Sequence, residues 1–296
     1  MERNFIGSSD IAAVLGLSRW CTPLKLWAEK TGKIEPDDLS DNEAVEWGKR
    51  LEEIVAQKFA DTHNVKLMAY KKRFSHPEHE FLTCELDRII TGTETIVEVK
   101  TCSAWKAKEW EDEEIPTEYI LQVQFAMGLS KRKHAFIAVL VGGNRYVEKE
   151  LDFDEEIFEN MVEKAVGFWD MVQNDIAPVA MIGDKDTLAA LFPEEKEERT
   201  FMEGDRAELL EKMFKQRKHH QEEMKQHEKL KEKAENAIKE IIQDMEGIET
   251  EKYVSTWEAQ TRTYADVNRM KEDGIYEKYS YETSSRVLRV REKKEK

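Results

Sequence analysis

The sequence predicts an α+β protein, in which a core of strands and helices is followed by a long helix and a small α+β appendage. Short apolar or alternating runs between turn residues indicate strands, and residues 135–140 form the most apolar of these runs. Apolar residues recur every three or four positions over 42–62 and 157–172, as they do in helices with one buried face. Residues 205–245 contain neither Gly nor Pro and are rich in Glu, Lys and Gln, which predicts one long helix or a helical hairpin.

These elements divide the chain into four segments. We expect a core over 1–175, a linker over 176–204, the long helix or helical hairpin over 205–246 and the appendage over 247–296. The linker holds two of the six prolines and an acidic run. In the appendage we expect a strand over 252–264, a short helix from about residue 266, and pairing of that strand with the alternating segment 284–291.

The composition excludes some classes of protein. Lys and Arg number 46 against 62 Asp and Glu, a net charge of −16, which argues against a protein that coats DNA through its overall charge. Three widely spaced cysteines indicate a reducing compartment rather than a disulfide framework. No apolar run approaches the ~20 residues of a membrane span, and the N-terminus lacks the apolar stretch of a signal peptide. The sequence therefore predicts a soluble, intracellular protein.

A predicted β-hairpin over residues 83–100 gathers the most informative polar side chains. Its first strand carries Asp87, and its second strand ends with Glu98 and Lys100. Because side chains alternate along a strand, Glu98 and Lys100 share one face while Val97 and Val99 point to the other. Two acids and a lysine at the end of a hairpin with an apolar opposite face indicate a site rather than a core.

These residue types suit phosphodiester hydrolysis. Two carboxylates can share one divalent cation, and Mg²⁺ favours a few carboxylates together with waters and substrate phosphate. Such a cation polarises the phosphate and lowers the pKa of bound water. A protonated lysine such as Lys100 cannot ligate the metal, but it can orient the attacking water and offset charge on the scissile phosphate. The spacing of Asp87, Glu98 and Lys100 is by itself a weak pattern, and it gains weight from its neighbours.

Two helices contribute further candidates. Glu52 borders the predicted buried stripe of the helix over 42–62, so it is either a structural acid or a site residue; the stripe consists of Trp47, Leu51, Val55 and Phe59. After Pro116, a predicted helix places Gln122 and Gln124 inside an apolar run, where a buried amide needs a hydrogen-bond partner.

The N-terminal segment allows two interpretations. Residues 8–10 can cap a short helix that ends at Gly16, and Thr22 with Pro23 can begin a second one. The two helices either pack on a sheet or, with Arg3 and Ser9 close by, expose a helix start to an anion.

The histidines give weaker signals. The segment 76–79 has His-x-x-His spacing, but Pro77 predicts a turn, and no acid or cysteine is placed to complete a zinc site. The neighbouring pair His219 and His220 is typical of the solvated face of the long helix.

Taken in order, these residues resemble the YqaJ-like viral recombinase family, which is related to the phage lambda exonuclease within the PD-(D/E)xK nuclease superfamily. The resemblance covers roughly residues 3–172. It is carried by Ile6-Gly7-Ser8-Ser9-Asp10-Ile11-Ala12-Ala13-Val14-Leu15-Gly16, Thr22-Pro23-Leu24-x-Leu26-Trp27, Gly48-x-x-x-Glu52, Asp87, Glu98-Val99-Lys100 and Tyr119-x-x-Gln122-x-Gln124.

The resemblance implies an α/β/α restriction-endonuclease-like core, with a mixed sheet flanked by helices. It implies a DNA exonuclease that depends on Mg²⁺, with Mn²⁺ as a substitute, and that digests one strand of a duplex end from 5′ to 3′ in phage-type homologous recombination. The implied partners are double-stranded DNA ends and a single-strand annealing protein, in the cytoplasm of a bacterial host of the phage or prophage. Related nucleases form trimeric rings, although no feature of the sequence fixes the oligomeric state.

The resemblance also assigns roles to individual residues. The metal ligands are Asp87, Glu98 and the main-chain carbonyl of Val99. Lys100 is the catalytic lysine, and Asp87 and Glu98 belong to the catalytic set together with Glu52, the helical acid, and Gln122, the motif glutamine. The residues that hold DNA or its 5′-phosphate are Arg3, Ser9 and Lys106, the last at the approximate position of an arginine.

Two other functions stay open from the sequence. One is a structure-specific or non-processive endonuclease of the same superfamily, although its iron–sulfur members need four cysteine ligands and this chain has three cysteines. The other is a catalytically silent DNA- or partner-binding module that uses the long helix for recruitment.

Overall fold

The structure is a computed structural model that describes residues 4–112, 114–195, 199–281 and 288. The chain divides into two compact units, Met1–Pro193 and Glu194–Lys296. Within the described residues, the helices are too short or too polar to cross a membrane.

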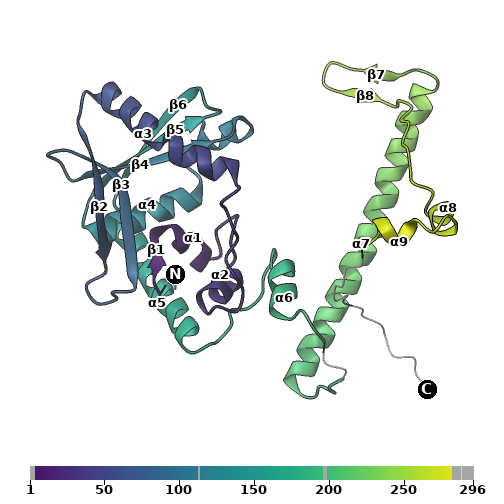
Figure 1. Ribbon diagram of the computed structural model, residues 1–296, viewed down its shortest axis with the longest axis horizontal. Coiled ribbons are helices and arrows are strands. Elements are labelled where there is room, and N and C mark those ends of the chain that lie inside the picture. The colour runs from purple at the N-terminus through teal and green to yellow at the C-terminus, as the bar shows by residue number, and fades with distance from the viewer. Residues whose placement is uncertain (1–3, 113, 196–198, 282–287, 289–296) are drawn as a thin grey trace. The chain divides into compact units, whose positions relative to one another are not determined.

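A six-stranded mixed sheet forms the centre of the first unit (Figure 1). Its strands are β1 (Ile6–Gly7), β2 (Leu67–Ser75), β3 (Leu82–Ile90), β4 (Thr95–Cys102), β5 (His134–Val141) and β6 (Arg145–Asp152). The order is β1-β3-β4-β5-β6, and β2 also pairs with β3. The β1/β3 and β4/β5 pairs are parallel, whereas β2/β3, β3/β4 and β5/β6 are antiparallel.

Helices cover both faces of this sheet (Figure 1). They are η1 (Ser8–Asp10), α1 (Ile11–Val14), α2 (Pro23–Lys30), α3 (Glu43–His63), η2 (Ala104–Trp110), α4 (Thr117–Ser130), α5 (Glu155–Gln173) and α6 (Lys185–Leu191). The smaller core lies between α3 and the sheet, where Val55 and Phe59 meet Val97 and Val99. The larger core joins α1, α2, α4 and α5 to the other face, which includes Ile96. The mixed α+β fold flanked by helices is therefore confirmed.

Local sequence signals begin and end several of these helices as predicted. The side chain of Thr22 accepts a hydrogen bond of 3.1 Å from the Lys25 amide and caps α2, whose first residue is Pro23. Gly16, just beyond α1, has a φ of +70°, a conformation that glycine adopts without steric cost.

The predicted buried stripe of α3 is correct only in the second half of the helix. Val55 and Phe59 are 2 % and 0 % exposed, but Trp47 is 55 % exposed, so the prediction for Trp47 was wrong. No residue of α3 before Val55 is buried. The helical period places Trp47 on the same side as Val55, but the buried residues of α3 begin only at Val55.

The segment after α5, up to Pro193, belongs to the first unit. Asp184 is only 1 % exposed. Its carboxylate accepts one hydrogen bond from the hydroxyl of Thr22 and another, of 2.8 Å, from the Met181 amide. The helix α6 that follows contacts α2. The first compact unit therefore continues beyond residue 175 to Pro193.

The second unit is built on one long helix, α7 (Asp205–Ile242), rather than on a helical hairpin. It also contains β7 (Gly247–Glu249), β8 (Val254–Thr256), α8 (Val267–Glu272) and α9 (Tyr276–Tyr279). The predicted strand over 252–264 is reduced to β8, which pairs with β7. The segment 284–291, expected to supply that partner, lies outside the described residues apart from Leu288.

Candidate active site

The pairing between β3 and β4 stops where the predicted acids begin. The two strands pair at Arg88 with Val97 and at Ile89 with Ile96, and the ladder goes no further. One step beyond it, the Val99 amide donates a hydrogen bond of 2.9 Å to the Asp87 carboxylate instead of to a strand carbonyl. The strand pairing thus ends at the point where Asp87 and Glu98 stand opposite each other on the two strands.

Glu98, Lys100 and Gln122 form a hydrogen-bonded set at this point. The Lys100 ammonium donates to Glu98 Oε1 at 2.6 Å and to the Gln122 side-chain oxygen at 3.2 Å. The Gln122 amide nitrogen donates to the same Glu98 oxygen at 2.7 Å. The α4 helix supplies Gln122 from the face of the sheet to which Glu98 and Lys100 point. The half-buried side-chain amide of Gln122 therefore has two hydrogen-bond partners.

Gln124, the second glutamine that the sequence singled out on α4, makes other contacts. Its amide nitrogen donates to the Asp152 carbonyl at 2.7 Å, and its oxygen accepts from the Asp154 amide at 2.9 Å. Gln124 therefore ties α4 to the segment between β6 and α5 and lies outside the candidate site.

The electrostatics of Asp87 and Glu98 suit a divalent cation. Burial, followed by the charge of Glu98, raises the pKa of Asp87 to about 7, although the Val99 amide and Lys100 oppose this change. Burial lowers the pKa of Lys100, but the charge and hydrogen bond of Glu98 outweigh that effect and raise it overall. Two ionised carboxylates, the buried Glu98 and the half-buried Asp87, with one lysine carry an excess negative charge. Hard oxygen donors with such an excess fit Mg²⁺ or Mn²⁺, and the Val99 carbonyl stands on the strand between Glu98 and Lys100.

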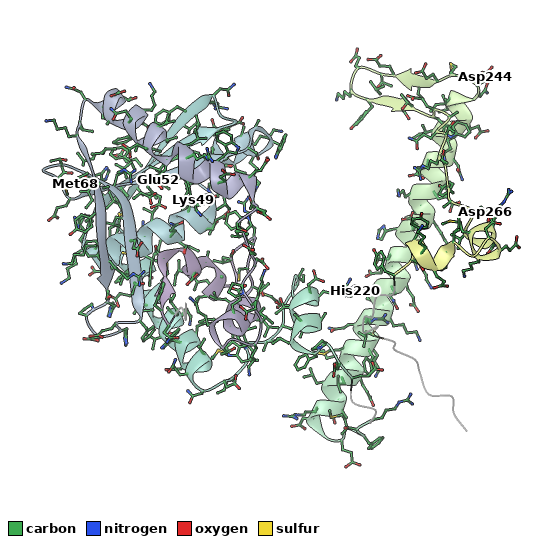
Figure 2. The ribbon with its side chains drawn as sticks, in the orientation of Figure 1. Lys49, Glu52, Met68, His220, Asp244 and Asp266 are labelled. Carbon is green, nitrogen blue, oxygen red and sulfur yellow. The ribbon has the colours of Figure 1, made fainter. Side chains whose placement is uncertain are left out.

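Glu52 is held at the edge of the site by an arginine. The Arg88 guanidinium donates to Glu52 at 2.8 Å, to Glu53 at 2.7 Å and to the Asp87 carbonyl at 2.7 Å. Glu52, labelled in Figure 2, belongs to α3, the helix that packs on β4. Its charge also contributes to the raised pKa of Asp87, so Glu52 lies within electrostatic reach of the acids.

A cleft of about 740 Å³ borders this constellation, and both Ser9 and Lys106 line it. Tyr119, another lining residue, has its ring centre 5.2 Å from the Lys100 ammonium and so connects the cleft to the acids. The structure thus brings Ser9 and Lys106 to one cleft beside Lys100. Arg3, the third residue predicted to hold DNA or its 5′-phosphate, lies outside the described residues.

A buried ion pair fixes the segment from Phe5 to Asp10, which contains Ser9. The ammonium of Lys30, whose side chain is 3 % exposed, contacts the Asp10 carboxylate at 2.8 Å and the Phe5 carbonyl at 2.6 Å. The same carboxylate accepts from the Gly7 amide at 3.1 Å. Ser9 therefore lies exposed on η1, between β1 and α1. The packing of the two helices is confirmed, and the anion site stays a prediction.

Sequence reasoning overlooked Arg88 and Tyr119. Arg88 follows Asp87, so strand alternation already directs its side chain to the opposite face, toward the helix that carries Glu52. Tyr119 appears in the sequence as part of a motif, but only the fold shows its ring beneath Lys100.

The histidines stay outside this site. His76 accepts hydrogen bonds of 3.2 Å from the amides of Glu78 and His79, as expected for a turn. Among the described residues, one group of three potential ligands from His, Cys, Asp and Glu is close enough to hold a metal ion, namely His219, His220 and Glu223 on the exposed surface of α7. Cys21, Cys84 and Cys102 are all free thiols.

Comparisons with known proteins identify the family of this chain. Residues 1–133 match the family model of the YqaJ-like viral recombinase domain. The uncharacterized protein YqaJ of Bacillus subtilis strain 168 is 34 % identical over 302 residues, which cover 98 % of this chain and 92 % of that protein. The chain belongs to the YqaJ-like viral recombinase family.

Solved structures support the same fold. The alkaline exonuclease LHK-Exo from Laribacter hongkongensis has a TM-score of 0.51 at 15 % identity, over 59 % of this chain and 91 % of that one. The structure of LHK-Exo in complex with dAMP gives the same TM-score at 16 % identity, with the same coverage. At this level of identity the likeness shows the fold of the first unit.

Proposed function

We propose that this protein is a metal-dependent deoxyribonuclease that degrades one strand of duplex DNA from an end, in the 5′-to-3′ direction, with Mg²⁺ as its ion. The observation that carries the proposal is the end of the pairing between β3 and β4 at Asp87 and Glu98, with Lys100 and Gln122 bonded to Glu98. Membership in the YqaJ-like viral recombinase family and the fold shared with an alkaline exonuclease support it.

The ion would be held by Asp87, Glu98 and the Val99 carbonyl, and Mn²⁺ would replace it. When bound, the ion supplies Lewis acidity toward the scissile phosphate and acidity to water. Lys100 offsets the charge that develops on the phosphate oxygens and orients the attacking water. Gln122 holds Lys100 and Glu98 in register. The water oxygen bonds to phosphorus and loses a proton, and the bond from phosphorus to the 3′-oxygen breaks. That oxygen takes up a proton, so the terminal nucleotide leaves with a 3′-hydroxyl and its own 5′-phosphate, and the cleaved phosphate stays as the new 5′ end of the strand.

The residues around the acids would place the end of the strand. Ser9 and Lys106, from opposite parts of the sequence, line the same cleft and would bind a terminal phosphate together with Arg3. Glu52 would act from α3 on the water network around the ion, positioned by its ion pair of 2.8 Å with Arg88.

The first test uses linear and covalently closed circular duplexes with Mg²⁺, and compares the wild type with Lys100→Met. We expect the wild type to degrade the linear duplex and to leave the circle intact, while Lys100→Met loses at least 100-fold in rate, on the order of a lost charge-stabilising contact. Lys58→Met is the matched control, because Lys58 is an exposed lysine of α3. Undiminished degradation by Lys100→Met would refute the proposed role, and nicking of the circle would favour the endonuclease alternative.

Polarity is tested with duplexes that carry phosphorothioate linkages at the 5′ or the 3′ ends. We expect 5′ linkages to block the reaction and 3′ linkages to leave its start unaffected. The reverse pattern would overturn the assigned direction. An absence of cleavage with every substrate, together with an absence of Mg²⁺ and Mn²⁺ binding in a metal titration, would favour the binding-module alternative.

The proposal extends to two assemblies that the family suggests, a homo-oligomer such as a trimeric ring around DNA and a complex with a single-strand annealing protein. Light scattering of the full chain with and without duplex DNA tests the first. A mass that stays that of a monomer under both conditions would exclude the ring. Co-purification of the full chain with a phage-type single-strand annealing protein tests the second, and recovery of the two proteins separately would contradict it.

A further inference from the structure

An exposed tryptophan stands in the wall of the cleft next to the proposed cleavage site. Trp20 lines the cleft and is 55 % exposed, a large apolar surface left open to water. Its ring centre lies 6.2 Å from that of Tyr119, which stacks at 5.4 Å on the buried Trp110. The ring of Tyr119 in turn lies 5.2 Å from the Lys100 ammonium. A row of aromatic rings therefore leads from the open cleft to the lysine of the reaction centre.

Cations flank the exposed ring. The Arg19 guanidinium lies 5.5 Å and the Lys106 ammonium 5.8 Å from the centre of the Trp20 ring. Arg19 is held in place by Glu109 at 2.8 Å and Glu118 at 2.6 Å. For Lys106, in contrast, no ion pair with an acid is found in the part of the chain that the structure describes, so its charge is available to a ligand.

This combination fits a nucleotide better than a purely apolar ligand. A flat ring flanked by cations can stack a base while a cation binds the adjoining phosphate, and such stacking tolerates every base because each has a π-face. The cleft, at about 740 Å³, lies within the usual range for small-molecule sites. The row of rings runs from Trp20 through Tyr119 to Lys100, so Trp20 lies on the cleft side of the proposed scissile position.

We infer that Trp20 is a stacking platform for an unpaired base of the strand that enters the active site, with Lys106 on the neighbouring phosphate. The inference rests on the proposed nuclease function and adds to it the form of the substrate. A base stacked on Trp20 inside the cleft has left its duplex partner.

The test removes the ring and the base separately. Wild type, Trp20→Ala and Trp20→Phe are assayed on 5′-phosphorylated duplexes that carry an abasic nucleotide at the first, second or third position. Trp47→Ala is the matched control, because Trp47 is also 55 % exposed and lies 5.9 Å from a cation, Arg50, yet does not line the cleft. Circular dichroism confirms that each variant is folded.

We expect an abasic nucleotide at one of the three positions to raise the KM of the wild type about 5- to 150-fold, the range that stacking on an aromatic side chain supplies. Trp20→Ala should show a KM raised by a similar factor on the intact duplex and no further rise with the abasic one. Trp20→Phe should recover part of the loss, and Trp47→Ala should behave as the wild type. Equal abasic penalties in wild type and Trp20→Ala, or an unchanged KM in Trp20→Ala, would overturn the inference.

A binding assay distinguishes a failure of this inference from a failure of the proposed function. Should the wild type cleave no DNA, the proposed function fails, and fluorescence anisotropy with the same 5′-phosphorylated oligonucleotides still measures stacking. A weaker binding of the intact oligonucleotide by Trp20→Ala, absent with the abasic one, would support the platform. Identical binding curves for wild type and Trp20→Ala would refute it.

Discussion

Replacing Asp87 with Asn should stabilise the metal-free protein at pH 8 and abolish its response to Mg²⁺. Burial and the charge of Glu98 raise the pKa of Asp87 to about 7, from an ordinary value of 3.8. Between these two values the folded chain keeps a proton that the unfolded chain has lost. The contribution of Asp87 to the free energy of unfolding therefore falls as the pH rises from about 4 to about 7, and stays low above that.

The size of this effect follows from the two pKa values. At about 1.36 kcal/mol for each pKa unit, the ionised Asp87 costs the metal-free fold at most about 4 kcal/mol at pH 8. An asparagine at this position is neutral and its side-chain oxygen can still accept from the Val99 amide. A bound divalent cation removes the same penalty in the wild type, which links folding to metal binding.

The assay is urea denaturation of wild type and Asp87→Asn in a chelator at pH 5 and pH 8, followed by tryptophan fluorescence. Six of the seven tryptophans precede residue 194, so the signal reports mainly on the first unit. We expect Asp87→Asn to gain on the order of 2–4 kcal/mol over the wild type between pH 5 and pH 8. Addition of Mg²⁺ at pH 8 should stabilise the wild type alone. A difference between the two proteins that is the same at both pH values would refute the reasoning.

Two further substitutions test the packing and the site. Gly128→Ala should lower the free energy of unfolding by about 1–3 kcal/mol, because a Cβ at this position would lie 2.1 Å from the ring of Phe158; a denaturation midpoint equal to that of the wild type would contradict the close packing of α4 on α5. Gln122→Leu removes the amide that contacts both Glu98 and Lys100, and should reduce kcat about 10- to 100-fold at saturating DNA with little change in KM. A loss that appears only in KM would instead place Gln122 in DNA binding.

The sequence alone determined the hairpin and the division of its side chains. Strand alternation is a local geometric property, so it placed Glu98 and Lys100 on one face and Val97 and Val99 on the other before any fold was known, and the two cores show that division. The start of α2 was equally predictable, because Thr22 satisfies a backbone amide three residues away.

Tertiary structure decided which surfaces are covered and which strands pair. The exposure of Trp47 could not be predicted from its helical period, since that period gives a side of the helix and not how far the sheet extends beneath it. The β8 strand pairs with β7 across a short turn, a partner that the sequence analysis did not name, and such a local hairpin has a small loop-closure cost.

The candidate site shows most clearly which features follow from the sequence and which from the tertiary structure. Its acids and its lysine were identified from order and spacing along the chain. Three other features arise only when separate elements pack together. They are the end of the pairing between β3 and β4, the ion pair between Glu52 and Arg88, and the row of rings from Trp20 to Lys100. Residue types fix which chemistry is available, whereas packing fixes the distances at which charges and rings act on one another.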